Sequence, residues 1–277
     1  MDKFYVITNT MKDVDYKVTN DIKAFIESAG KTCIIGEKEE NGHIVKGTVP
    51  DNMDCAIILG GDGTMIQAAR ELRYVDYPLL GINMGTLGYL TEVEVQDAKK
   101  QIESLFSTDP VTEKRMMLQA FINQEREEIA LNDVVVSRRG GLRILQFDIY
   151  VNGDLLDSYQ ADGVIVSTPT GSTGYNLSAG GPVVEPTASL VVITPICAHA
   201  LNTGSVVLSA EDTIEIQIAE GRYGKIEDAA VSFDGTDMIA LQTGDRVTIQ
   251  KAAEVTKLVK LNGESFLKTM RRKMKGN

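Results

Sequence analysis

The sequence predicts a protein of two parts, an α/β domain followed by a β-rich domain. Up to about residue 105, short apolar runs alternate with amphipathic helical patterns, which is typical of a mostly parallel sheet flanked by helices. From Arg115 onward, strand-like segments follow one another and predict packed β-sheets. We therefore expect an α/β domain over residues 1–110, a β-rich domain over residues 111–262, and a C-terminal helix over residues 263–277 that packs on the first domain. The chain has 277 residues, of which 43% are hydrophobic, enough to bury a full core without disulfides.

The elements of the first domain follow from the spacing of apolar residues. Strand-like apolar runs cover residues 4–8, 32–35, 56–59 and 79–83. Three other segments carry apolar residues on one helical face: Val18, Ile22, Phe25 and Ile26; Met65, Ala69 and Leu72; and Val95, Ala98, Ile102, Leu105 and Phe106. Gly30 predicts the end of the first helix. Alternation of strands and helices implies that helices cover both faces of the sheet.

Period-two alternation predicts the strands of the second domain. Apolar and polar residues alternate over residues 145–151, 214–218 and 247–249. Asn152-Gly153 directly follows the first of these segments and is typical of a two-residue hairpin turn. The terminal helix is expected at residues 265–275.

Composition and charge argue against several classes of protein. The net charge of −11 disfavours a broad nucleic-acid or membrane surface. No apolar run reaches the ~18 residues of a membrane span, so we expect a cytoplasmic protein. Cys33, Cys55 and Cys197 lie far apart and are odd in number, which indicates neither a zinc site nor a disulfide framework. The basic tail from Lys257 is either a nucleic-acid tail or a solvated terminal helix with cations near its C-terminal end, and we favour the helix.

The segment Ile58-Leu59-Gly60-Gly61-Asp62-Gly63-Thr64-Met65 joins a predicted strand to a predicted helix. This turn lies at the C-terminal edge of a parallel sheet, where the backbone of Gly60, Gly61, Gly63 and Thr64 can cradle a phosphate. It is neither a Walker loop nor the dinucleotide fingerprint, and it holds no lysine, so Mg²⁺ or residues elsewhere must neutralise the phosphate. Asp62 is then a general base for an attacking hydroxyl or a metal ligand, and the alternative is a turn in which Asp62 caps the helix.

The same loop is similar to a kinase signature. Gly60-Gly61-Asp62-Gly63-Thr64 resembles the segment shared by NAD kinases, diacylglycerol and sphingosine kinases and, more loosely, 6-phosphofructokinases. That resemblance implies phosphoryl transfer to a hydroxyl activated by the aspartate. Further stretches resemble NAD kinases in the expected order: GINMGTLGYLTE at 81–92, Leu131-Asn132-Asp133, the run from Ala161-Asp162-Gly163 through STPTGSTGYNLSAGGP at 167–182, TPICAH at 194–199 and SFDG at 232–235. From about Val6 onward the chain is thus similar to bacterial-type ATP/polyphosphate-NAD kinases.

The resemblance implies transfer of the γ-phosphate of ATP, or of a phosphate of polyphosphate, to the 2′-hydroxyl of the adenosine ribose of NAD⁺, giving NADP⁺. It implies that Asp62 is catalytic, that Mg²⁺ is held mainly by the ATP phosphates, and that the subunits form a homodimer or homotetramer. The implied NAD⁺-binding residues, carried over by position, are Asp62, Gly63, Asn132, Asp133, Asp162, Thr170, Thr173, Gly174, Tyr175, Ser178 and Asp234.

Residue chemistry agrees with the role implied for Asn132 and Asp133. The Asn132 amide offers a donor and an acceptor to an adenine edge, and the adjacent carboxylate suits a ribose diol, although a strand-end turn is an alternative. The family usually has glutamate where this chain has Asp133, so we expect the carboxylate role to persist with a changed reach to the ribose. Without the resemblance, Asp234-Gly235 indicates only a hairpin.

The cations that contact the phosphates are not fixed by the sequence, and Arg115, Arg138, Arg139 and Arg222 are candidates of equal rank. The rival functions are a lipid or sugar kinase with the same loop and a non-catalytic protein that senses NAD(P). The Asn132-Asp133 pair and the 161–182 stretch argue against the first rival. An intact Asp62 argues against the second, because a sensor needs no carboxylate beside the hydroxyl.

Overall fold

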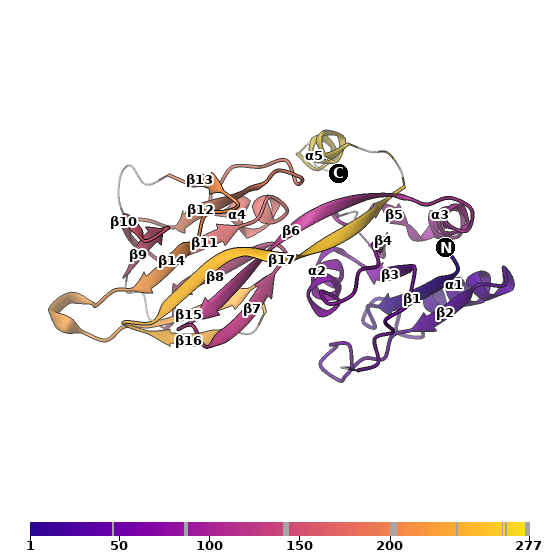
Figure 1. Ribbon diagram of the computed structural model, residues 1–277, viewed down its shortest axis with the longest axis horizontal. Helices are drawn as coiled ribbons and strands as arrows, with labels where there is room; N and C mark the ends of the chain where they lie inside the picture. Colours follow the sequence, from indigo (N-terminus) through magenta and orange to yellow (C-terminus); the bar gives the residue numbers. More distant parts are fainter. Residues whose placement is uncertain are drawn as a thin grey trace. The chain divides into compact units, whose positions relative to one another are not determined.

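The computed structural model of the chain describes residues 1–45, 47–85, 88–140, 144–199, 204–236, 238–261, 263 and 265–274. The chain divides into two compact units (Figure 1). Unit 1 comprises Met1–Lys114 and Thr256–Asn277, and unit 2 comprises Arg115–Val255. The sequence predicted boundaries after residues 110 and 262, whereas these divisions fall within two long strands. In the described part of the chain, no helix is long and apolar enough to cross a bilayer.

Unit 1 is an α/β structure with the alternation of strands and helices that the sequence predicts. Its elements are β1 (Lys3–Thr8), α1 (Lys17–Ser28), β2 (Thr32–Ile35), β3 (Cys55–Gly60), α2 (Asp62–Glu71), β4 (Leu79–Asn83), β5 (Val93–Glu94), the 3₁₀ turn η1 (Val95–Asp97), α3 (Ala98–Leu105), the end of β17 (Arg246–Lys260) and α5 (Phe266–Met274).

The sheet of unit 1 is parallel. Its strand order is β2-β1-β3-β4, and the free edge of β4 pairs with β17 at Leu79 and with β5 at Ile82. Every residue of β3 and β4 is buried, as expected for continuous apolar runs in a sheet that is covered on both faces. The C-terminal ends of β1 and β3 lie side by side, with Thr8 paired to Leu59, so the segments that follow them meet at one edge.

Helices pack on both faces of this sheet. Ile22 and Ile26 of α1 and Ile102 of α3 join the core formed with Leu80 and Ile82. The side chain of Gly81 would point to the opposite face, where the Met65 methyl group of α2 lies 2.7 Å from the position that a Gly81 Cβ would take. The prediction that helices flank the sheet is therefore confirmed.

Unit 2 is rich in β-structure. Its elements are β6 (Val111–Ile122), β7 (Arg126–Ala130), β8 (Asp133–Arg138), β9 (Leu145–Val151), β10 (Asp154–Ala161), β11 (Gly163–Ser167), η2 (Gly171–Thr173), α4 (Tyr175–Ser178), β12 (Leu190–Ile196), β13 (Val206–Ser209), β14 (Ile214–Ile218), η3 (Arg222–Gly224), β15 (Asp228–Phe233), β16 (Ile239–Gln242) and the first part of β17.

Two antiparallel arrangements of strands make the core of unit 2. One has the order β10-β9-β14-β17, and the other has the order β13-β12-β11-β8-β15-β16. Phe147 and Ile149 of the first and Val164, Val166 and Phe233 of the second belong to one buried apolar cluster. Two packed sheets are thus confirmed, because each supplies one apolar face to the same core.

Several local predictions are confirmed and one needs correction. Asn152 and Gly153 have positive φ angles of 53° and 90° and connect β9 to β10, as a type I′ hairpin requires. The first turn of the helix predicted from Val95 is the 3₁₀ turn η1. The segment 168–174 contains the 3₁₀ turn η2. The terminal helix is present as α5, and Lys275 lies outside the described residues.

Candidate functional site

The GGDGT loop changes directly from strand to helix. β3 ends at Gly60, and α2 begins at Asp62 with the extended Gly61 as its N-cap residue. A Cβ on Gly60 would lie 2.3 Å from the Thr64 Oγ1, so the buried Thr64 side chain can fold back over the turn only because residue 60 has none. The first backbone N–H groups of α2 therefore lie directly at the sheet edge. These N–H groups and the helix dipole favour binding of an anion there.

The Asp62 carboxylate is held by a second loop. Its Oδ2 accepts the Tyr89 N–H at 2.7 Å, and its Oδ1 accepts the Leu90 N–H at 3.0 Å and the Thr91 hydroxyl at 3.3 Å. The side chain makes no capping hydrogen bond to α2, so the capping alternative is wrong. A Cβ on Gly88 would lie 1.7 Å from the Asp62 Oδ1, which leaves glycine as the residue that fits there.

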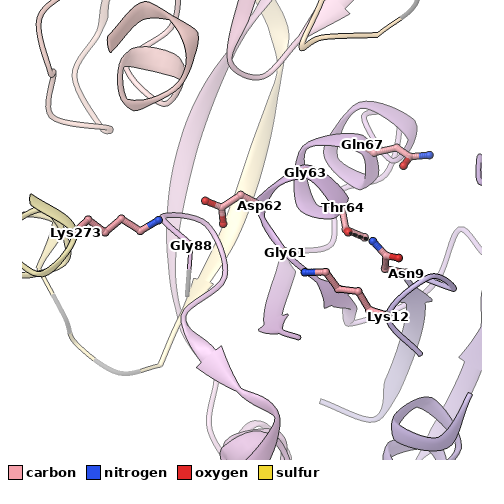
Figure 2. Close-up of a pocket in the computed structure, with 9 residues that line it drawn as sticks. All are labelled: Asn9, Lys12, Gly61, Asp62, Gly63, Thr64, Gln67, Gly88 and Lys273. Carbon is pink, nitrogen blue, oxygen red and sulfur yellow. Dashed lines mark hydrogen bonds between the residues drawn. The ribbon is translucent and has the colours of Figure 1, made fainter. Parts of the chain in front are cut away.

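The turn that follows β1 completes this edge. The Asn9 N–H donates to the Leu59 carbonyl, and the Asn9 amide donates to the Thr64 hydroxyl at 3.0 Å (Figure 2). The Lys12 N–H in turn donates to the Asn9 carbonyl, so one tight turn fixes the Lys12 backbone next to the GGDGT loop. The Lys12 Nζ lies 3.2 Å from the position that a Gly61 Cβ would take.

These residues line a cavity of about 530 Å³ in unit 1. Its lining consists of Asn9, Lys12, Gly61, Asp62, Gly63, Thr64, Gln67, Gly88 and Lys273. Figure 2 shows the Lys12 ammonium near Gly61 and the Lys273 ammonium, from α5, on the side of Gly88. The cavity thus combines the α2 N-terminus with two ammonium groups and one carboxylate.

Neither lysine was among the cations considered from sequence. The four arginine candidates do not line this cavity: the buried Arg115 donates to the Thr170 hydroxyl, and Arg138 pairs with Asp162 at 2.8 Å. The position of Lys12 in the sequence could have indicated its role. Lys12 closely follows β1, which lies next to β3, the strand that leads into GGDGT. Lys273 had no such signal, because the basic tail indicated only a solvated terminal helix, and the structure places this residue of α5 in the cavity lining.

A second cluster of predicted site residues lies in unit 2, around the start of β8. Asp234 has a left-handed φ of 53° in the turn after β15, and its carboxylate accepts the N–H groups of Leu131, Asn132 and Asp133 at 2.8, 2.7 and 3.1 Å. Three such bonds fix the backbone of the Asn132-Asp133 segment. The structure therefore gives Asp234 a positioning contact that the hairpin signal did not indicate.

The loop after β11 is bonded to the same segment. The Thr168 hydroxyl donates to the Leu131 carbonyl at 2.7 Å, and the Thr168 N–H donates to the Asn132 carbonyl at 2.8 Å. A Cβ on Gly174 would lie 3.6 Å from the Asn132 Nδ2 and 4.0 Å from the Asp133 Oδ2, so all three residues come together. The Asn132 Oδ1 is buried and has no hydrogen-bond partner among the described residues.

Asp133 has an unusual electrostatic environment. Its carboxyl group is buried, and burial together with the nearby Asp234 carboxylate raises the pKa of Asp133 to about 7. A hydroxyl-rich ligand placed beside this group would supply the donors that the ionised form lacks.

The remaining predicted NAD⁺-binding residues occupy more varied positions. Thr170 is buried and its hydroxyl accepts the Arg115 bond, while Thr173 bonds back to the Thr170 carbonyl at 3.4 Å. Tyr175 and Ser178 are exposed on α4, and Asp162 is partly exposed beside Arg138.

Two family models match the chain. The ATP-NAD kinase N-terminal domain matches residues 7–110, and the ATP-NAD kinase C-terminal domain matches residues 131–261. The NAD kinase of Lachnoclostridium phytofermentans is 44% identical over 281 residues, and the alignment covers 99% of each chain. The chain belongs to the NAD kinase family. The NAD kinase of Lachnospira eligens is also 44% identical, over 293 residues that cover 99% of this chain and all of that one.

Two solved structures share the fold of this NAD kinase family member. The crystal structure of yeast NADH kinase complexed with NADH has a TM-score of 0.85 at 21% identity and covers 100% of this chain and 88% of its own. That of an NAD kinase from Archaeoglobus fulgidus in complex with ATP has a TM-score of 0.78 at 24% identity and covers 98% of both. Family membership makes the chain a kinase that phosphorylates NAD to NADP, which replaces the lipid kinase, sugar kinase and sensor alternatives.

Proposed function

We propose that the chain transfers the γ-phosphate of ATP to the 2′-hydroxyl of the adenosine ribose of NAD⁺. The observation that carries this proposal is the cavity at the start of α2, with Asp62 as its carboxylate. Exposed helical N–H groups and ammonium groups attract phosphate, whereas a carboxylate repels it unless a hydroxyl or a metal ion lies between them. The cavity thus has the groups needed for a phosphoryl donor and for a hydroxyl acceptor.

Asp62 would orient the ribose hydroxyl and accept its proton. The N–H groups of Tyr89 and Leu90 fix the direction of the carboxylate, and its Oδ2, which accepts one hydrogen bond, retains a lone pair for the hydroxyl. Phosphoryl transfer passes through a loose transition state, so placing the hydroxyl in line contributes more than strong basicity does.

The cluster around β8 would bind the nucleoside of NAD⁺. The buried Asn132 Oδ1 would accept the adenine amino group, and the Asp133 carboxylate would accept ribose hydroxyl groups. A ligand without these donors would leave a buried acceptor unsatisfied, which is the basis of strong discrimination. The other residues proposed to contact NAD⁺ are Gly63, Asp162, Thr170, Thr173, Gly174, Tyr175, Ser178 and Asp234.

Mg²⁺ would accompany ATP and would be held mainly by the phosphates, where it neutralises their charge. In the described residues there is no group of three or more His, Cys, Asp or Glu side chains placed to hold a metal ion. Asp62 is the acidic residue of the cavity lining. This donor set fits Mg²⁺ that arrives with the nucleotide, because Mg²⁺ retains water and phosphate ligands readily.

The proposal extends to the setting of the reaction. Polyphosphate is proposed as a second phosphoryl donor, a homodimer or homotetramer as the assembly, and the cytoplasm as the location, all carried over from the family resemblance. Assays with polyphosphate in place of ATP, and the molar mass in solution, test the first two.

The central experiment compares wild type with Asp62→Asn. We expect turnover to NADP⁺, followed with an NADP-specific dehydrogenase, to fall by at least about two decades, as is usual for loss of an acid–base group. NAD⁺ affinity, measured by calorimetry, should stay within a few fold. Asp109→Asn, an exposed acidic residue outside the cavity lining, is the matched control. Near-normal turnover in Asp62→Asn would reduce Asp62 to a structural residue.

A further inference from the structure

The two lysines of the cavity come from opposite ends of the chain. Lys12 belongs to the turn after β1 and Lys273 to the last helix, α5, yet both line the same space. Figure 2 shows them approaching from different sides, Lys12 toward Gly61 and Lys273 toward Gly88, with the start of α2 between them. Lys12 and Lys273 are called the lysine pair below.

Glycines leave room for the Lys12 ammonium. Its Nζ lies 3.2 Å from the position of a Cβ on Gly61 and 3.3 Å from that of a Cβ on Gly85. A side chain at either position would crowd the ammonium. Among the described residues no carboxylate forms an ion pair with Lys12, so its charge is available to a ligand.

Aromatic contacts position the Lys273 ammonium. Its Nζ lies 4.4 Å from the centroid of the Tyr89 ring, and the Phe266 ring, also on α5, lies 6.2 Å from that of Tyr89. The Tyr89 N–H is one of the donors to Asp62. Helix α5 therefore packs on the loop that holds the catalytic carboxylate and projects a cation into the same cavity.

The charges of this cavity differ from those of the whole protein. The chain carries a net charge of −11, whereas the charged residues of the cavity lining are two lysines and one aspartate. A local excess of positive charge in an acidic protein is what a polyanionic substrate requires, because the rest of the surface repels it.

We propose that the lysine pair binds the phosphates of the phosphoryl donor from the two sides of the α2 N-terminus, so that α5 is part of the active site. This assignment rests on the proposed transfer from ATP. Lys12 contacts the phosphates near Gly61, and Lys273 contacts them near Gly88. The ligand class is a linear triphosphate, with or without an attached nucleoside.

The test uses inorganic tripolyphosphate as the probe and isothermal calorimetry as the readout, so that phosphate binding is measured apart from catalysis. Lys12→Met and Lys273→Met keep an apolar stem and remove the charge. Each should weaken tripolyphosphate binding at least about tenfold, the usual value for loss of a charged hydrogen bond. Lys273→Arg should restore most of the affinity. Lys17→Met on α1 and Lys268→Met on α5, both exposed and outside the lining, should bind as wild type does.

Steady-state kinetics separate phosphate binding from a packing role. The KM for ATP should rise at least about tenfold in both lysine-pair variants, while the NAD⁺ affinity stays within a few fold. Three results would each overturn the assignment: wild type that does not bind tripolyphosphate, lysine-pair variants that bind it like the controls, or controls that lose as much affinity. If wild type forms no NADP⁺ but the lysine pair governs tripolyphosphate binding, the proposed reaction fails and the phosphate assignment stands. If wild type forms NADP⁺ but the lysine-pair variants bind tripolyphosphate like the controls, the phosphate assignment fails and the proposed reaction stands.

Discussion

The buried Asp133 makes a sharp prediction about how stability depends on pH. Burial and the Asp234 carboxylate raise the pKa of Asp133 from 3.8 to about 7 in the folded protein. Between these two values the folded state binds more protons than the unfolded state, so this residue lowers the free energy of unfolding as pH rises from about 4 to about 7. Above about 7 the loss is complete. Asp133→Asn removes the ionisation while nearly preserving the shape.

The size of the effect follows from the same pKa. At about 1.4 kcal/mol for each pH unit, ionisation of Asp133 costs about 4 kcal/mol of stability above pH 7, of which about 3 kcal/mol arises between pH 5 and pH 7. We therefore expect Asp133→Asn to have a higher free energy of unfolding than wild type at pH 8. At pH 5 this difference between the variant and wild type should be smaller by about 3 kcal/mol.

Thermal unfolding of both proteins at pH 5, 6, 7 and 8 measures this difference. At about 2–4 °C for each kcal/mol, the gap in Tm should widen by about 6–12 °C from pH 5 to pH 8. Asp154→Asn, an exposed residue on β10, is the control, and its gap should not change with pH. A gap for Asp133→Asn that does not change with pH, or a variant that is less stable at pH 8, would refute the reasoning.

Two further substitutions test the contacts that position the site. In Gly88→Ala the new methyl group would meet the Asp62 carboxylate, so turnover should fall by about two decades, as for an acid–base residue that is misplaced. Gly204→Ala, in open space, should turn over normally. Asp234→Ala leaves three N–H groups without their acceptor and should lower the free energy of unfolding by about 2–4 kcal/mol, measured by denaturant titration. A loss no larger than that of Asp154→Ala would contradict this role.

The fold was predictable where local chemistry decides the structure. Asn152-Gly153 specifies its hairpin because both residues tolerate positive φ, and the apolar runs of β3 and β4 specify buried parallel strands. The boundaries between the two units were harder to predict from the sequence. Strands β6 and β17 run past the divisions of the chain, and periodicity shows which face of a strand is buried but not which unit it contacts.

The site was predictable as a set of residues but not as a set of contacts. The glycines around Asp62 indicated that the backbone can approach a phosphate closely. The family resemblance predicted Asn132 and Asp133 as binding residues. The direction of the Asp62 carboxylate depends on the Tyr89 and Leu90 N–H groups, which every residue type except proline carries, so no side-chain signature marks them. Lys273 reaches the cavity through tertiary packing of α5 on Tyr89. Along the sequence it is separated from the GGDGT loop by the whole of unit 2, so local patterns do not indicate this contact.

The path of the chain imposes an order on how the protein forms during synthesis. Unit 1 consists of Met1–Lys114 and Thr256–Asn277, and unit 2 is inserted between these two segments. Leu258 pairs with Leu79 of β4, and Phe266 and Lys273 contact Tyr89. A ribosome that has released the GGDGT loop must therefore translate all of unit 2 before the last strand and helix can join the first sheet. The nascent chain holds the GGDGT loop early and acquires the complete cavity only after α5 has been translated.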